Sequence, residues 1–302
     1  MPVAGGSLEA DGPEDLFDAA IIGAGPAGAS CAIWLARLGC RAILIEAAGS
    51  PGGLLRETPF RNDWIATQPG ATGFELAANL GVSLAAASVS TIMGRRVDAV
   101  DGGQGRFSVH LAGGQSVRAR HVVLATGVQP VRGGLVPGES ILIGPGRHVA
   151  EARFTGQRVA ILGGGDNALE NYAFIRTRGA AQVHVYARTL RGQRAAIAAA
   201  EPADLHVGTY DVDGLTLCVS GQRYDRLVVM YGWEPSPLPE MPAKLARDRR
   251  GFLDVHPHTC ETRLAGLFAI GEVTRRNHPC VVTAMADGIV AAKTIQASVE
   301  LT

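Results

Sequence analysis

The amino-acid sequence predicts an α/β protein made of two doubly wound domains, the second inserted in the first. Three observations predict this class. A glycine-rich motif occurs twice, at residues 23–28 and 163–168, each time between an apolar run and a segment with helical periodicity. The segments 122–130 and 227–235, which follow the two motifs, resemble each other. The last part of the chain, residues 252–302, belongs to neither repeat, and it is long enough to return to the first domain and complete it.

The first motif lies between two predicted buried strands. The apolar run 19–22 predicts a strand of a parallel sheet, and the apolar spacing of residues 31–38 predicts a helix. Residues 41–45 predict a second strand, which ends at Glu46. Strand, glycines, helix, strand and acid thus follow one another in the order that a Rossmann-like dinucleotide-binding unit requires.

Each glycine of the first motif has a physical task. Gly23 allows the tight turn, Gly25 lets the backbone approach a pyrophosphate, and Gly28 lets the helix pack on the strand. The helix N-terminus then presents free N–H groups and the positive end of its dipole to the phosphates. Because Glu46 can accept hydrogen bonds from both hydroxyls of an adenosine ribose, the unit predicts binding of an adenosine diphosphate group.

The second motif follows a predicted strand at residues 157–162 and precedes a helix that runs to about Arg176. The next strand, residues 181–186, ends without an acid and is followed by Arg188. An acid at this point repels a ribose 2′-phosphate, whereas an arginine attracts it, so NADPH is expected and NADH is possible. The residues assigned to this dinucleotide are Gly163, Gly165, Asp166, Asn167, Ala168 and Arg188. An alternative stays open: a Rossmann-like half can persist without binding anything.

Short alternating segments broken by glycine follow each motif and predict a small antiparallel meander. They are residues 96–100, 106–111 and 115–118 in the first copy, and residues 206–210 and 215–219 in the second. In the unrepeated end, a strand at residues 267–270 and a helix from about Val281 are expected.

The domain boundaries follow from this succession. We expect one domain of residues 17–130 and 233–302, interrupted by a second domain of residues 131–232. Residues 1–16 are acidic and glycine-rich without the basic and apolar regions of a signal peptide, so they predict a flexible leader.

Composition excludes several other classes of protein. The chain has 302 residues, with 28 basic and 28 acidic side chains, so its formal net charge of zero argues against nucleic-acid binding or a polybasic membrane contact. No apolar run reaches the roughly 18 residues of a membrane span. None of the five cysteines forms a CxxC pair, and no residues have zinc-ligand spacing, so no metal site is expected. A reducing cytoplasm is the expected compartment.

The motifs together resemble the low-molecular-weight thioredoxin reductase family of flavoproteins and its ferredoxin–NADP reductase relatives, from about Phe17 onwards. The motifs that carry the resemblance are Gly23–Gly28, Glu46, Pro51–Gly53, Ala125–Gly127, Gly163–Asp166 and Gly271–Val273. The resemblance implies that the first domain binds FAD, that the inserted domain binds NADPH and that the protein is a homodimer. The residues it assigns to FAD are Gly23, Gly25, Pro26, Ala27, Gly28, Glu46, Gly52, Gly53, Ala125, Thr126, Gly127, Gly271, Glu272 and Val281.

The chain departs from that family at four points. Residues 135–156 contain no cysteine, although the family carries its CxxC motif there, and dithiol chemistry needs two adjacent thiols. Glu272 replaces the family's aspartate. Ala187-Arg188-Thr189 replaces a His-Arg-Arg cluster, and Pro279-Cys280-Val281 replaces Arg-Gln-Ala. Thioredoxin reduction by the family's route is therefore not expected.

Two residues before the last helix have alternative interpretations. Cys280 is either a redox thiol close to the flavin, with its pKa lowered by the helix N-terminus, or a small buried apolar residue. His278 is either a proton donor near the flavin or a loop histidine that bonds to the backbone. No side chain is required as acid or base for hydride transfer, so no catalytic residue is assigned with certainty.

The sequence thus predicts an FAD-dependent oxidoreductase that passes electrons from NAD(P)H through the flavin to an unidentified acceptor, a small redox protein or a small molecule. Two alternatives stay open. One is a ferredoxin-linked flavoenzyme that uses no nicotinamide, and the other is an FAD-binding sensor or scaffold without catalysis.

Overall fold

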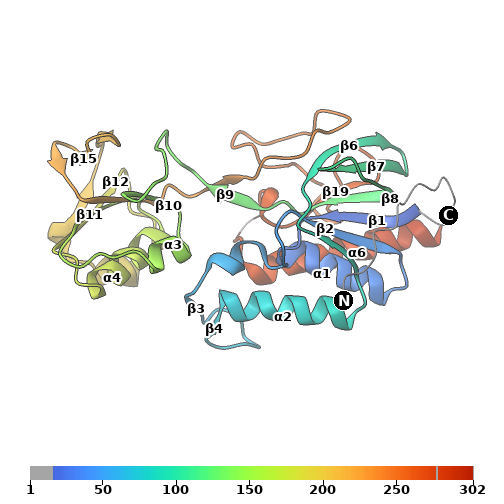
Figure 1. Ribbon diagram of the computed structural model, residues 1–302, viewed down its shortest axis with the longest axis horizontal. Coiled ribbons are helices and arrows are strands. Elements are labelled where there is room, and N and C mark those ends of the chain that lie inside the picture. Colours follow the sequence, from blue (N-terminus) through green and yellow to red (C-terminus); the bar gives the residue numbers. More distant parts are fainter. Residues whose placement is uncertain (1–15, 277, 302) are drawn as a thin grey trace. The chain divides into compact units, whose positions relative to one another are not determined.

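The computed structural model describes residues 16–276 and 278–301 (Figure 1). The predicted leader lies outside the described residues, apart from Leu16, which already belongs to the first strand. The chain forms two compact units. The first consists of residues up to 56, 61–127 and from 235 onwards, and the second consists of residues 57–60 and 128–234. The second unit is therefore an insertion in the first, as the sequence predicts.

The first unit is built on a mainly parallel sheet. Its parallel strands are β1 (Leu16–Ile22), β2 (Ala42–Glu46), β5 (Ser90–Met93), β8 (Ser116–Leu124) and β19 (Leu267–Ala269). They lie in the order β5-β2-β1-β8, and β19 pairs with the end of β8. A strand from the C-terminal part of the chain thus joins the sheet that the N-terminal part begins.

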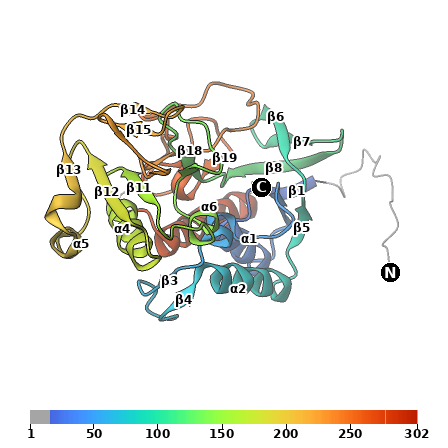
Figure 2. The same cartoon turned by 60° about the vertical axis from the view of Figure 1, so that its left-hand side comes forward.

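Different layers cover the two faces of this sheet (Figures 1 and 2). On one face lie helices α1 (Pro26–Arg37), α2 (Gly73–Ala86) and α6 (Val281–Glu300). On the other lies the antiparallel meander of β6 (Val97–Gly103) and β7 (Arg106–Leu111), which continues into β8. Two hydrophobic cores result, one on each face of the sheet.

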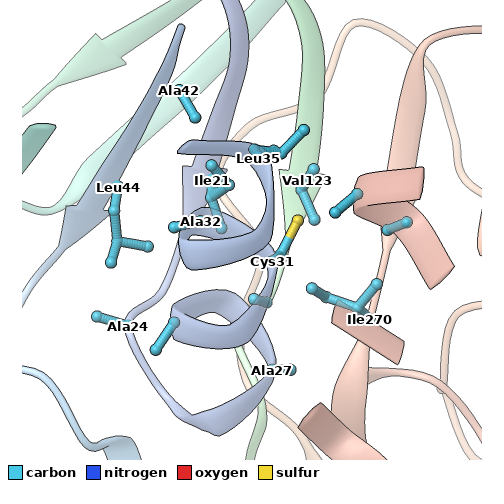
Figure 3. Close-up of a cluster of buried hydrophobic side chains, with 14 of the residues drawn as sticks. Ile21, Ala24, Ala27, Cys31, Ala32, Leu35, Ala42, Leu44, Val123 and Ile270 are labelled. Atoms are coloured by element: carbon cyan, nitrogen blue, oxygen red, sulfur yellow. The ribbon is translucent and has the colours of Figure 1, made fainter. Parts of the chain in front are cut away.

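The core under α1 explains the helical spacing seen in the sequence. Figure 3 shows Cys31 and Leu35 of α1 directed at Ile21 and Val123 of the sheet and at Ile270. All five side chains are completely buried. Burial of a large aliphatic side chain stabilises the fold by about 1.5–3 kcal/mol, so this packing rather than intrinsic propensity determines where α1 lies.

The stretch between β2 and β5 contains short elements before α2. They are the 3-10 helix η2 (Gly53–Glu57) and the strands β3 (Arg61–Asn62) and β4 (Ala71–Thr72). Helix α2 begins with a capping box, in which the Thr72 side chain accepts from the Glu75 N–H and the Glu75 side chain accepts from the Thr72 N–H.

The second unit has its own parallel sheet. The strands β10 (Ile141–Ile143), β11 (Arg158–Leu162), β12 (Gln182–Ala187), β13 (Leu205–Val207) and β17 (Arg226–Val229) pair in the order β10-β17-β11-β12-β13. The remaining elements are short, apart from α4; they are β9 (Val128–Pro130), α3 (Arg147–Ala150), α4 (Asp166–Thr177), α5 (Arg194–Ala199), η3 (Pro202–Asp204), β14 (Val212–Asp213), β15 (Cys218–Val219), β16 (Gln222–Arg223) and β18 (Trp233–Pro235).

The predicted meander segments are only partly right. Residues 115–118 and the buried strand that begins at Val122 form the single strand β8, whose first half alternates in burial and whose second half is buried throughout. The first half pairs with β7, whereas the second half lies between β1 and β19. In the second unit, His206 pairs in parallel with Tyr186 of β12, so residues 205–207 extend the main sheet instead of forming a meander.

Candidate functional site

The first glycine motif forms the turn between β1 and α1, and two of its glycines are required by packing. Gly23 has φ +106°, and a β-carbon on it would lie 2.4 Å from the carbonyl oxygen of Ala125. A β-carbon on Gly28 would lie 1.9 Å from the carbonyl oxygen of Gly23. No side chain fits at either position. The two glycines therefore allow close packing of the turn against α1 and against the residue that follows β8.

Gly25 is different because the space beside it is free. It is the N-cap of α1 and provides no side-chain hydrogen bond to the helix. A β-carbon here would come no closer than 3.9 Å to another atom, the Cα of Gly53. The Gly52 N–H donates to the carbonyl of Ala24 at 2.8 Å, which holds the turn at residues 51–53 beside the motif. An uncapped helix N-terminus between two glycine turns is a cradle that fits a pyrophosphate.

Glu46 lies at the end of β2, where its carboxylate is held by the backbone. Its Oε2 accepts from the Ala24 N–H at 2.6 Å and its Oε1 accepts from the Ala48 N–H at 2.8 Å. Each carboxylate oxygen has two acceptor sites, so one on each remains for further donors. The arrangement fits the two hydroxyls of a ribose.

The segment after β8 contributes a buried polar atom without a partner. Among the described residues, the Thr126 hydroxyl oxygen is buried and forms no hydrogen bond. Buried polar atoms in native proteins are nearly always satisfied, so this hydroxyl is available to a polar ligand group. Thr126 and Gly127 follow β8 as Gly23 follows β1 and Glu46 ends β2, so the carboxyl ends of neighbouring parallel strands bring them to one edge of the sheet.

The fourth strand that ends at this edge is β19, followed by the 3-10 helix η4 (Gly271–Val273). Gly271 has φ +70°, and its β-carbon would lie 2.8 Å from that of Ala27 in α1, so the two predicted FAD segments are in contact. Burial raises the pKa of the Glu272 carboxyl.

Cys280 is the N-cap of α6, and its thiol is exposed. Its Sγ accepts from the Thr283 N–H at 3.5 Å. Partial burial pushes the pKa of Cys280 up, but hydrogen bonds from the Thr283 hydroxyl and from the Thr283 and Val282 amides outweigh it and lower the pKa. The interpretation of Cys280 as a buried apolar residue is therefore wrong.

His278 lies two residues before Cys280 and is also exposed. Its backbone has φ +56°, and its carbonyl accepts from the Thr283 hydroxyl at 3.2 Å. The structure gives its ring no hydrogen bond to a described residue, so the interpretation as a loop histidine bonded to the backbone through its ring finds no support there.

The second glycine motif forms the turn between β11 and α4. A β-carbon on Gly163 would lie 2.1 Å from the Met230 carbonyl oxygen, whereas one on Gly165, the uncapped N-cap of α4, would meet no atom within 4 Å. The segment after β12 is tied to this turn, since the Arg191 N–H donates to the Gly164 carbonyl at 2.6 Å. Arg188 is exposed and has no ion pair or hydrogen bond with a described residue.

Comparison with known proteins decides the family. The model of the family described as "Pyridine nucleotide-disulphide oxidoreductase" matches residues 17–288. The chain belongs to this family. It is 29% identical to the thioredoxin reductase of Bacillus subtilis over 95% of this chain and 96% of that protein. It is 32% identical to the ferredoxin–NADP reductase of Granulibacter bethesdensis over 85% of this chain and 81% of that one.

Solved structures show the same fold. Lactococcus lactis thioredoxin reductase superposes with a TM-score of 0.79 at 22% identity, covering 95% of this chain and all of that chain. The Staphylococcus aureus bacillithiol disulfide reductase superposes with a TM-score of 0.77 at 16% identity, covering 94% and 99% of the two chains. The predicted class, two Rossmann-like domains with the second inserted in the first, is confirmed.

Membership of this family makes the chain an NAD(P)H-dependent flavin oxidoreductase. Its thioredoxin reductase and ferredoxin–NADP reductase members use FAD and NADPH, which confirms the two expected cofactors at the level of the family. Within the described part of the chain, no helix has the length and hydropathy needed to cross a membrane.

Sequence reasoning missed two residues close to the predicted site. The buried Asp287 of α6 forms an ion pair with the partly exposed Arg276 beside Gly271. The available signal is an acid in a helix that is otherwise apolar on that side, at Met285-Ala-Asp-Gly288.

Proposed function

We propose that this chain binds FAD in its first unit and NADPH in its second, and that it passes electrons from NADPH through the flavin to an acceptor that is not a dithiol. One observation carries the proposal. The uncapped N-terminus of α1, the held carboxylate of Glu46 and the unpartnered hydroxyl of Thr126 lie at the same sheet edge. When bound there, FAD supplies the capacity to accept a hydride and to release electrons.

The chain's own residues bind and orient the cofactor. The first-turn N–H groups of α1 donate to the pyrophosphate, and the backbone at Gly25 and Gly53 leaves room for it. Glu46 would accept the ribose hydroxyls, and Thr126 would donate to another polar group of the cofactor. The remaining assigned FAD contacts are Pro26, Ala27, Gly52, Ala125, Gly271, Glu272 and Val281.

The N-terminus of α6 provides electrostatic stabilisation. This helix has 20 residues, and its dipole places partial positive charge at Val281. This helix end would stabilise negative charge on a flavin bound beside it. Cys280 caps the same turn, and its thiol is exposed.

In the second unit, the free space at Gly165 and the uncapped start of α4 support a second dinucleotide site. The contacts assigned there are Gly163, Asp166, Asn167, Ala168 and Arg188. Arg188 has no acid partner among the described residues, so its guanidinium is available to a 2′-phosphate.

The distribution of cysteines supports an acceptor that is not a dithiol. The stretch 135–156 contains no cysteine, and all five cysteines of the chain are free. The relative of Granulibacter bethesdensis is named a ferredoxin–NADP reductase. We therefore place a ferredoxin-type small redox protein first among acceptors, and the cytoplasm as the compartment that keeps the free thiols reduced.

The test is anaerobic reduction of the purified yellow protein, followed at the flavin absorbance maximum. Rapid bleaching by NADPH supports the proposal. Bleaching by reduced ferredoxin but by neither NADPH nor NADH would support a ferredoxin-fed flavoenzyme. A protein that no donor reduces would be an FAD-binding sensor or scaffold, and one that contains no FAD would overturn the proposal entirely.

We further propose that the protein is a homodimer. The resemblance to the family supports this assembly. Light scattering coupled to gel filtration would then give twice the chain mass of 31.4 kDa.

A further inference from the structure

Asp287 is a buried acid beside Gly271 and the first turns of α6. None of the assigned cofactor contacts explains its presence there. It lies in α6 and is 6% exposed. Its Oδ2 accepts from the Gly271 N–H at 3.1 Å, and its Oδ1 pairs with the guanidinium of Arg276. The Cys260 thiol donates to the same Oδ1 at 3.9 Å. Both carboxylate oxygens thus have donors within the protein.

Arg276 contacts α6 at two places, Asp287 and the first turn. The Nη1 that pairs with Asp287 also donates to the Thr283 carbonyl at 3.0 Å, in the first turn of α6. Asp287 and Arg276 therefore fasten both ends of the segment 271–276 to α6. Glu272, the residue that departs from the family's aspartate, lies inside this segment.

The helix packing around Asp287 allows little adjustment. A β-carbon on the neighbouring Gly288 would lie 2.4 Å from the Ala27 carbonyl oxygen and 2.7 Å from the Cys31 nitrogen. Helices α6 and α1 are thus in backbone contact next to Asp287, and Figure 3 shows Ala27 and Cys31 on the side of α1 that faces Ile270. Because the two helices cannot shift, replacing the Asp287 carboxylate is expected to move the segment 271–276, including Arg276.

We infer that Asp287 is a positioning residue for the flavin. It holds Gly271 and Glu272 at the carboxyl edge of the sheet, and it neutralises the Arg276 cation beside the start of α6. The inference rests on the proposed function, because it assigns Asp287 an effect on bound FAD. Removing Arg276 leaves the buried Asp287 uncompensated, and removing Asp287 leaves the partly exposed Arg276 uncompensated, so the reduction potential of the flavin senses the pair.

The experiment uses three variants of the FAD-loaded protein. Asp287→Asn keeps an acceptor for the Gly271 N–H but leaves Arg276 unbalanced, Arg276→Gln leaves Asp287 unbalanced, and the double variant removes both charges. The exposed pair Arg96–Asp98 provides the control Asp98→Asn. The readouts are the reduction potential from a dye-coupled titration, FAD affinity from flavin fluorescence, and thermal unfolding of the apoprotein.

The two single variants are expected to shift the potential in opposite directions. An uncompensated cation stabilises the more negative reduced flavin, so Asp287→Asn raises the potential by the equivalent of about tenfold, roughly 30 mV for a two-electron couple. Arg276→Gln lowers it, and the double variant returns close to the wild-type value. FAD affinity is expected to fall about tenfold in Asp287→Asn and to stay unchanged in Asp98→Asn.

If Asp287 had a purely structural role, the variants would unfold at lower temperatures, and every variant that retains flavin would keep the wild-type reduction potential. This result would overturn the inference. If Asp287→Asn does not fold, the sign of the shift in Arg276→Gln decides alone. Failure of the proposed function is a separate outcome, because the wild-type protein would then bind no FAD or resist reduction by NADPH.

Discussion

At the scale of single residues, Gly25 is the position where ligand binding and folding can be separated. Its backbone is extended, with φ −70° and ψ −177°, and a β-carbon would meet no atom closer than 3.9 Å. Gly25→Val should therefore fold but place its side chain against the pyrophosphate, so that the protein purifies without FAD. The measurement is the ratio of flavin to protein absorbance, together with the unfolding temperature of the apoprotein.

The contrast is Gly28→Ala in the same motif, which should lose stability as well as flavin because of the 1.9 Å approach to the Gly23 carbonyl oxygen. A Gly25→Val protein that keeps its full flavin content would show that this loop does not bind the cofactor.

A second prediction at this scale concerns the titration of Cys280. Its pKa lies below the ordinary thiol value, because the hydrogen bonds at the start of α6 favour the thiolate over the opposing effect of partial burial. Alkylation by iodoacetamide should therefore reach half its maximal rate at a lower pH in the folded protein than in the urea-unfolded protein. Thr283→Val removes the hydroxyl bond and should move the midpoint up.

The Cys280→Ser variant identifies the signal, since only the reaction it abolishes belongs to this thiol. Identical midpoints for the folded and unfolded protein would contradict the structure of this turn.

At the scale of elements, the crossing of α1 and α6 explains a glycine in the middle of a helix. Replacing glycine by alanine in a helix interior ordinarily stabilises it by up to about 1 kcal/mol. Gly288→Ala should instead destabilise the protein by about 1–3 kcal/mol, as overpacking does, because the methyl group meets the α1 backbone. Urea unfolding measures the free energy of both variants.

Gly81→Ala in α2 is the matched control for this prediction. Its β-carbon would lie 3.6 Å from the nearest atom, Pro51 Cγ, which is an ordinary contact, so this variant should be neutral or more stable. Equal effects at the two positions would mean that α1 and α6 do not meet as described.

The loop after β12 carries a prediction about the nicotinamide cofactor. A charge-assisted hydrogen bond contributes about 1.5–3 kcal/mol, so Arg188→Ala should weaken NADPH binding by about tenfold to hundredfold and leave NADH binding almost unchanged. Titration with each dinucleotide measures both constants. Arg178→Ala, at the C-terminal end of α4, is the control and should change neither.

A wild-type protein that binds neither dinucleotide at millimolar concentration would make the second glycine motif a structural remnant. The ferredoxin-fed or non-catalytic alternative would then replace the proposed function.

At the scale of the whole molecule, the distribution of thiols supports the proposed acceptor that is not a dithiol. No two of the five cysteines are adjacent in a CxxC pair, and the segment 135–156 has none. We expect no NADPH-dependent reduction of thioredoxin above the flavin background, in the wild-type protein and in Cys280→Ser alike. A thioredoxin turnover that Cys280→Ser abolishes would show that this thiol takes part in dithiol exchange.

The parts of the fold that the sequence predicts correctly are those in which local pattern and tertiary packing agree. The run 19–22, the glycines and the helical spacing after them all become β1, the turn and α1. The sequence also predicts the C-terminal strand and α6, because apolar runs of that length have to be buried. At Gly23 and Gly28 there is no room for a β-carbon, so no other residue fits. The glycine motif therefore predicts this turn from the sequence alone.

The parts that the sequence does not predict depend on pairing between distant segments. The sequence pattern predicts two segments where β8 is a single strand, because its half beside β7 alternates while its half beside β19 is apolar throughout. The pairing of His206 with Tyr186 places β13 in the parallel sheet of the second unit, and no local sequence pattern predicts this pairing. The acid in the apolar side of α6 is visible in the sequence, but its pairing with Arg276 is not, because the pair forms only when the turn before α6 folds back on that helix.

The pairing of β19 with β8 has a consequence for the order in which the protein forms during synthesis. A chain that leaves the ribosome N-terminus first contains β1, α1 and β8 long before residues 267–300 are synthesised. Until then, the apolar face of α1 is not covered by α6, and the end of β8 is not paired with β19. All strands of the second unit's sheet lie between residues 141 and 229, so the inserted unit can complete its core while its host is still open. Such long-range closure is slow and exposes apolar surface, and a chain stalled before residue 267 is therefore expected to hold one folded unit and one unit prone to aggregate.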